Sequence, residues 1–188
     1  MHDSELEHAI ASAAKDIFLT VEDSLNERRV FPALILLYTT LDIFGSLLRP
    51  KSEPDTSGQY FKTWAGIYML KGSSLLVTPD DLWGARCGLL HTNTPGSRIS
   101  RTGQAREIHY VRGNKDFADF LQKELQKAGD NTKVVVDIDM FFDAFSDGVV
   151  KFVGDIQTNA KLRETVFYHA KTMFSHSTYK VPQPPTKS

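Results

Sequence analysis

Apolar residues recur at steps of three and four along most of the chain, a spacing that predicts amphipathic helices. The first such stripe spans residues 4–27 and consists of Leu6, Ala9, Ile10, Ala13, Ile17, Val21 and Leu25. A second helix is predicted from near Phe31 to about Leu48, with Pro32 in its first turn, where a missing N–H costs no intrahelical hydrogen bond. Because this second helix carries apolar residues almost all the way round its axis, we expect it at the centre of a bundle.

Further helices are predicted downstream. Residues 59–70 carry aromatic side chains at helical spacing. Pro79 begins the next helix, with Thr78 as its N-cap and Asp80 and Asp81 in its first turn, and this helix has to end before Pro95. Helical spacing resumes over residues 140–152 and 155–174, with a kink expected at Gly154.

The helical spacing of apolar residues is lost in two short segments, REIHYV and KVVVDI. Their alternation and their β-branched residues predict strands. We expect them to pair as a β-hairpin of about residues 105–112 and 133–138, with a helical pattern at 116–128 in the connection. The predicted fold class is therefore mainly α, a helical bundle with a small β-hairpin. One domain is expected over residues 1–178, with the hairpin as an insertion at about 105–138. The segment 179–188 is rich in proline and is predicted to be a disordered tail.

Length and composition narrow the class of protein. The 188 residues are 41% hydrophobic, which fits one globular domain. A single cysteine, Cys87, excludes an intrachain disulfide and favours a reducing compartment. The most apolar stretch, 31–48, contains Asp42, and an Asp near a bilayer centre costs about 2.5–3.5 kcal/mol. We therefore expect a core helix, a cytoplasmic protein and no membrane contact.

Charge and spacing exclude several kinds of site. The net charge is −1, so the chain as a whole has no basic footprint for nucleic acid. The histidines and Cys87 do not have the spacing of a metal-ligand set, and the chain contains no glycine-rich phosphate loop. We expect neither a metal nor a cofactor.

The most informative segment is DLWGARCGLLHTNTP, residues 81–95. Arg86 and His91 stand five residues apart near the end of a predicted helix. Five residues correspond to about 500°, which places the two side chains roughly 140° apart around the axis. A long arginine side chain can still reach a histidine where the helix ends.

The Arg86-x4-His91 motif, together with the apolar helix ALILLYTTLD at 33–42 and the long terminal helices, resembles the HEPN superfamily of nucleotide-binding helical bundles. The resemblance covers most of the chain apart from the hairpin. It implies a metal-independent ribonuclease of a bacterial toxin or defence system. A homodimer would bring two motifs to one cleft, and a cognate antitoxin or regulator would be a partner. By this resemblance Arg86 binds the RNA phosphate and His91 transfers protons.

Other interpretations of the pair remain open. Active members of that superfamily commonly have a polar residue directly after the arginine, and this chain has Cys87. His91 could cap the helix C-terminus, and Arg86 could neutralise Asp42, since a buried carboxylate needs a partner. We expect Asp42 within hydrogen-bond reach of Arg86 or of a hydroxyl such as Tyr68. The alternative function is a non-catalytic dimerisation or binding module with Arg86 and His91 in structural roles.

A local basic stretch follows the motif. Residues 98–115 contain five basic side chains and a single acidic one, Glu107. The stretch either lines a phosphate-binding cleft beside His91 or forms a solvated loop and strand edge. The bases are Arg98, Arg101, Arg106, Arg112 and Lys115, of which the first three are the candidate RNA-binding residues.

Overall fold

The computed structural model describes residues 3–173 and confirms a mainly helical protein with two short strands. The predicted tail and Phe174, the expected end of the last helix, lie outside the described residues. In chain order the elements are α1 (Asp3–Asn26), α2 (Val30–Leu47), α3 (Gly58–Trp64), the π-helical η1 (Ala65–Leu70), α4 (Pro79–Thr92), α5 (Arg98–Arg101), β1 (Glu107–Val111), α6 (Lys115–Lys127), β2 (Lys133–Asp137), α7 (Ile138–Thr158) and α8 (Ala160–Met173).

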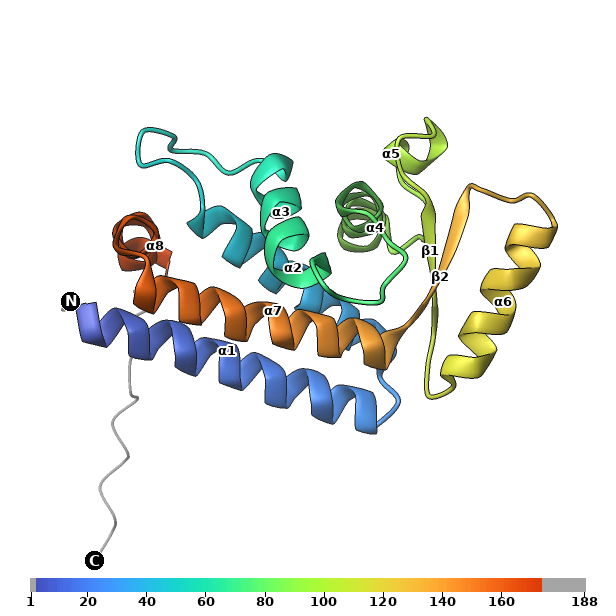
Figure 1. Ribbon diagram of the computed structural model, residues 1–188, viewed down its shortest axis with the longest axis horizontal. Helices are drawn as coiled ribbons and strands as arrows, with labels where there is room; N and C mark the ends of the chain where they lie inside the picture. The colour runs from blue at the N-terminus through green and yellow to red at the C-terminus, as the bar shows by residue number, and fades with distance from the viewer. Residues whose placement is uncertain (1–2, 174–188) are drawn as a thin grey trace, which may run out of the picture.

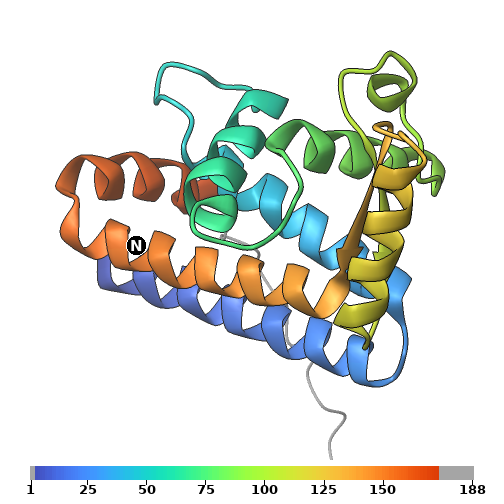
Figure 2. The ribbon, with the colours of Figure 1, turned by 45° about the vertical axis from the view of Figure 1, so that its right-hand side comes forward.

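The two longest helices, α1 and α7, lie side by side and run in opposite directions along the molecule, as both ribbon views show (Figures 1 and 2). Helix α2 packs against α1 and α3, which confirms the expected central position. Among the described helices, α2 alone is long and apolar enough by composition to cross a membrane. However, 56% of its residues are buried inside the protein, which is typical of a core helix.

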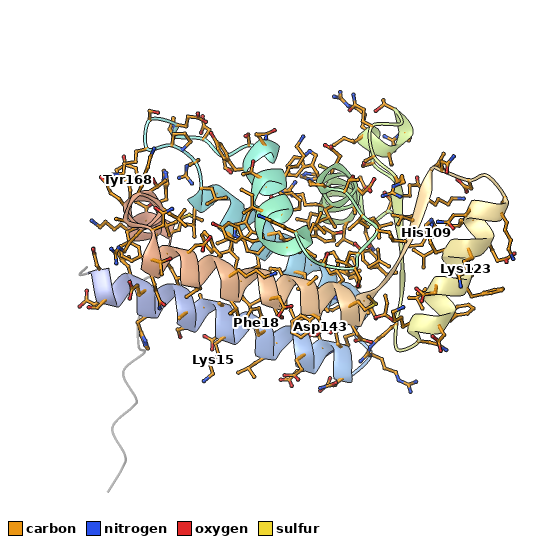
Figure 3. The ribbon with its side chains drawn as sticks, in the orientation of Figure 1. Lys15, Phe18, His109, Lys123, Asp143 and Tyr168 are labelled. Atoms are coloured by element: carbon orange, nitrogen blue, oxygen red, sulfur yellow. The ribbon has the colours of Figure 1, made fainter. Side chains whose placement is uncertain are left out.

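Aromatic rings join the helices in the core. The ring centroids of Phe44 on α2 and Trp64 on α3 are 5.7 Å apart, and the Trp64 ring is 6.0 Å from that of Phe152 on α7. Phe18 on α1 contacts Phe145 on α7 at 5.7 Å (Figure 3 labels Phe18). The predicted aromatic helix at 59–70 is confirmed, but its second half winds as a π-helix that the spacing did not indicate.

The predicted β-hairpin is wrong, because β1 and β2 pair in parallel, with Glu107 opposite Lys133 and Val111 opposite Asp137. Helix α6, which is 13 residues long, follows β1 in the chain and returns it to the end of the sheet where β2 begins. The second strand therefore starts at the same end as the first, which is the geometry of a β-α-β crossover. The supposed insertion is a β1-α6-β2 unit at one end of the molecule (Figure 1).

The kink expected at Gly154 is also wrong. Helix α7 continues through Gly154 to Thr158, since one glycine weakens a helix by only about 1 kcal/mol. The break falls at Asn159, whose backbone is extended and whose side-chain oxygen accepts a hydrogen bond from the Leu162 N–H at 3.1 Å. Asn159 thus ends one helix and caps the next.

A buried carboxylate fixes α4 to the sheet. Asp81 and Thr78 form a reciprocal capping box at the start of α4, as the sequence predicted for the cap. The side chain of Asp81, 3% exposed, also accepts the backbone N–H of Arg106 at 2.6 Å and its guanidinium at 2.6 and 3.1 Å. Burial alone raises the pKa of Asp81, but the hydrogen bonds from Arg106 and Thr78 outweigh it and hold that pKa below its usual value.

Replacing this carboxylate should destabilise the fold. Asp81→Asn puts an amide where Asp81 accepts bonds from Thr78 and Arg106, so we expect the free energy of unfolding to fall by about 3–5 kcal/mol. Urea denaturation measures it. The matched control is the exposed neighbour Asp80→Asn, which loses only the pair with Lys62 at 3.1 Å and should cost less than about 1 kcal/mol. Equal effects of the two changes would contradict the role assigned to Asp81.

The same contact should make stability depend on pH. Because the folded-state pKa of Asp81 lies below its unfolded value of about 3.9, its contribution is complete above that value and is lost as pH falls through the folded-state pKa. Urea denaturation should therefore give a difference in the free energy of unfolding between wild type and Asp81→Asn. This difference should be constant near neutrality and shrink below pH ~4. A difference that grows toward acid pH has the wrong sign for this account.

Candidate functional site

Arg86 is held against the central helix by an ion pair. Its Nε and one terminal nitrogen donate to the same Asp42 oxygen at 2.7 and 2.6 Å. The guanidinium also lies over the ring of Trp83, one turn earlier on α4, with its central carbon 5.1 Å from the ring centroid. The expected pairing of Asp42 with Arg86 is confirmed, and the planar guanidinium is fixed on two sides.

The other terminal nitrogen of Arg86 reaches His91. The distance from this nitrogen to His91 Nε2 is 3.1 Å, although the two residues leave the helix on different sides. Every N–H of a guanidinium is a donor, so Nε2 accepts this bond and the neutral imidazole carries its hydrogen on Nδ1. His91 itself is exposed at the last turn of α4.

Burial sets the protonation of the neighbouring groups. It raises the pKa of Asp42, and the guanidinium of Arg86 offsets part of this effect. Burial likewise raises the pKa of the Cys87 thiol, again partly offset by Arg86. Cys87 is therefore a protonated thiol at neutral pH, and it occupies the position after the arginine as a weak hydrogen-bonding group.

The end of α4 is shaped by Gly88 and Asn93. Asn93 adopts the left-handed conformation, with φ of 51°, and its N–H bonds back to the carbonyls of the last turn. The chain then folds over α4 so closely that a Cβ on Gly88 would lie 2.5 Å from the Thr94 carbonyl oxygen. Glycine is required here, and the return of the chain places α5 against α4.

The predicted RNA-binding arginines separate into two groups. Arg98 and Arg101 are exposed on α5, which packs against the helix that carries the motif. Arg106 is instead committed to Asp81 and to the carbonyl oxygen of Leu76 at 2.6 Å. The guanidinium of Arg106 is part of the fold, and its contact with RNA stays a prediction. Lys115 pairs with Asp119 at the start of α6.

Tyr68 does not support the motif. Its ring packs on Trp64 and Phe152, and its hydroxyl interacts with Asp155 on α7. Burial, with help from Asp155, raises the pKa of Tyr68 to about 12. The Tyr68 hydroxyl is therefore not the partner of Asp42. The contact of Trp83 with Arg86 was not predicted, although a spacing of three is the signal for contact on one helix.

A pair of buried hydroxyls beside α4 was not predicted from the sequence. Tyr38 on α2 and Tyr110 on β1 hydrogen-bond to each other beside a cavity of about 170 Å³, which is bounded by Leu89 of α4 and by Asn93, the C-cap of α4. Burial raises the pKa of both tyrosines, so both hydroxyls are neutral. The two residues are far apart in the chain, and no local pattern indicates their contact.

The described residues offer no metal site, and the comparisons offer no related protein, that would help to interpret the site. Within residues 3–173, no group of three or more His, Cys, Asp or Glu side chains is placed to hold a metal ion. Comparison of the chain with family models, with curated proteins and with solved structures found no match. The functional interpretation therefore rests on the arrangement of Asp42, Arg86 and His91.

Weakening the ion pair should cost stability. Asp42 and Arg86 side chains are 27% and 20% exposed, so water screens their attraction only in part. We expect Asp42→Asn to lower the free energy of unfolding by about 1.5–3 kcal/mol, because a charged acceptor of two short hydrogen bonds becomes neutral. Chemical denaturation measures the change. Glu164→Gln, in an exposed pair with Lys51, is the control and should be nearly neutral. An unchanged Asp42→Asn midpoint would show that the pair does not form.

Proposed function

We propose that the Arg86–His91 pair binds a phosphodiester group of RNA and cleaves it without a metal ion. The observation that carries this proposal is the 3.1 Å contact between an arginine nitrogen and His91 Nε2 at an exposed helix end, with the arginine fixed by Asp42. A fixed guanidinium offers planar donors to phosphate, and an exposed imidazole offers a nitrogen that can act as a general base.

Phosphate binding would separate the two side chains. The phosphate oxygens accept N–H groups of Arg86, including the one that bonds to His91 in the structure. That exchange frees the Nε2 lone pair beside the bound phosphate. Asp42 keeps the guanidinium in place while its partner changes, so little rotamer entropy is lost on binding.

Cleavage then needs one proton acceptor and one donor. His91 Nε2 takes the proton of the neighbouring 2′-hydroxyl, and the 2′-oxygen forms a bond to phosphorus. The bond from phosphorus to the 5′-oxygen breaks, and the imidazolium returns the proton to that leaving oxygen. Arg86 stabilises the charge that accumulates on the phosphoryl oxygens. The products are a 2′,3′-cyclic phosphate and a 5′-hydroxyl.

The surroundings of the pair fit this substrate. Arg98 and Arg101 are exposed on α5, which contacts α4, so further phosphates of a strand find basic side chains on the neighbouring element. The resemblance of Arg86-x4-His91 to the HEPN motif supports the same reaction. On that basis we infer a cytoplasmic ribonuclease of a toxin or defence system, restrained by a cognate antitoxin or regulator.

A second candidate is a binding module without catalysis. Two observations favour it: Cys87 occupies the position after Arg86, and the Asp42–Arg86 ion pair stabilises the fold whether or not a substrate binds. In such a module Arg86 and His91 hold RNA or a nucleotide by its phosphate, and no bond is broken. The two candidates differ in the fate of the RNA and not in the residues that touch it.

The cleavage proposal predicts a specific mutational pattern. His91→Ala should lower the rate of RNA cleavage by about 10²–10⁴-fold, because a general acid–base group is lost. Arg86→Lys should also lose most activity, since a point charge does not reproduce the planar donors. Cleavage should persist in EDTA, leave 2′,3′-cyclic ends and spare DNA. The assay uses gel-resolved products from purified protein and a panel of single-stranded RNAs.

The matched control is His109→Ala, an exposed histidine on β1, which should cleave like wild type. Circular dichroism of each variant establishes that the fold is intact. Wild-type protein that binds RNA through Arg86 but cleaves none of the panel would select the binding module. Full activity of His91→Ala would refute the catalytic role of His91.

A further inference from the structure

The cavity beside Tyr38 and Tyr110 lies next to the Arg86–His91 pair, but the proposed cleavage does not use it. Helix α4 packs against both α2 and β1 (Figure 1), and side chains of all three elements enclose a space of about 170 Å³, the α4 cavity. Its apolar walls are formed by Leu34 of α2, Ala85 and Leu89 of α4 and Ile108 of β1.

The inner wall of the α4 cavity carries a hydroxyl hydrogen without an acceptor. Tyr38 is fully buried, so it forms the inner wall, and its hydroxyl bonds to that of Tyr110. Two hydroxyls carry two hydrogens, and their mutual bond uses one. No other hydrogen-bond partner of either hydroxyl lies within residues 3–173. Because buried polar groups are normally paired, the remaining O–H indicates a ligand that accepts it.

The mouth of the α4 cavity carries a second polar group. Asn93 is exposed there, and its backbone N–H closes the last turn of α4. Its side-chain amide makes no hydrogen bond to the part of the chain that the structure describes. This planar group offers both donors and an acceptor to a ligand.

The size of the α4 cavity indicates which group fits. An apolar cavity of about 150 Å³ binds benzene, so about 170 Å³ admits one six-membered ring with its substituents. A pyrimidine base is such a ring, whereas a purine carries a second fused ring. Unstacked RNA bases are commonly recognised by contacts with their faces and by hydrogen bonds to their edges. Apolar walls with a polar group at each end provide both kinds of contact.

The α4 cavity adjoins the proposed phosphate contact. Tyr38 and Asp42 are one turn apart on the same side of α2, about 6 Å along its axis, and Asp42 holds Arg86. On α4, seven residues separate Arg86 from Asn93, which places them only about 20° apart around the axis. A base in the cavity is therefore joined through its own ribose to a phosphate at Arg86, and that ribose carries a 2′-hydroxyl.

We propose that the α4 cavity binds the pyrimidine base of the nucleotide whose 2′-oxygen attacks, so that RNA is cut on the 3′ side of uridine or cytidine. The inference rests on the proposed function for the place of the phosphate. The remaining O–H of the Tyr38–Tyr110 pair donates to an acceptor on the base, and the Asn93 amide bonds to its edge at the mouth. Holding the base positions the attacking hydroxyl beside the phosphate.

Calorimetric titration of the full-length protein with uridine 3′-monophosphate and adenosine 3′-monophosphate tests the proposal. The two probes share ribose and phosphate and differ only in the base. Wild type should bind the uridine compound at least about tenfold more tightly, since only its base enters the cavity. Equal affinities, or tighter binding of the adenosine compound, would overturn the proposal.

Two substitutions change the α4 cavity and leave Arg86 in place. Ala85→Leu fills the space and should abolish the preference for the uridine compound, whereas Ala11→Leu, the same change at an exposed residue of α1, should keep it. Asn93→Gly removes the amide, and glycine readily adopts the left-handed backbone found there, with φ of 51°. It should weaken binding of the uridine compound by about three- to tenfold. A preference that survives Asn93→Gly in full would contradict the proposal, even where circular dichroism shows that Ala85→Leu has not folded.

Arg86→Lys separates this inference from the proposed function. It should weaken both nucleotides by a similar factor and leave their ratio unchanged, because the α4 cavity remains. Wild type that binds both nucleotides equally through Arg86 would refute the base site and leave the phosphate site intact. A uridine preference with no effect of Arg86→Lys would refute the phosphate site and leave the base site intact. In a strand of adenosines with one uridine, wild type should cut directly after the uridine, and cutting elsewhere would contradict the proposed base preference.

Discussion

The buried carboxylate of Asp81 is the constraint on which the rest of the arrangement depends. It accepts the N–H of Thr78, the N-cap of α4, and holds Arg106, the residue just before β1. One group therefore sets the position of α4 relative to the sheet, and the core sets the position of α2. With both helices fixed, Arg86 meets Asp42 and the exposed end of α4 presents His91.

The site combines a rigid part with an accessible part. Asp42 and Trp83 restrict the guanidinium of Arg86, whereas His91 stands exposed at the helix end. Such a division suits recognition of a phosphate group, because the donors are ordered before the ligand arrives and the proton-transfer group remains reachable. The same ion pair would stabilise the fold as well as order Arg86 for the proposed phosphate contact.

Local patterns predicted what depends on neighbours in sequence. Spacing and backbone chemistry predict the start of α4 at Thr78 and Pro79 and its end before Pro95. They also predict the central position of α2. The direction of β2 could not be predicted in this way. An alternating pattern indicates a strand, but it does not say whether that strand runs parallel or antiparallel to its neighbour. The Asp81–Arg106 ion pair was not predicted either, because local charge does not reveal which arginines the fold itself uses.

The central claim is that Arg86 and His91 form the RNA phosphate site, and NMR spectroscopy tests it directly. A 2′-O-methylated oligoribonucleotide binds like RNA but lacks the nucleophile, so the complex is stable. The claim predicts that the side-chain Nε–H signal of Arg86 and the ring signals of His91 shift together and saturably as this oligonucleotide is added. Shifts confined to other residues, with both of these signals unchanged, would contradict it.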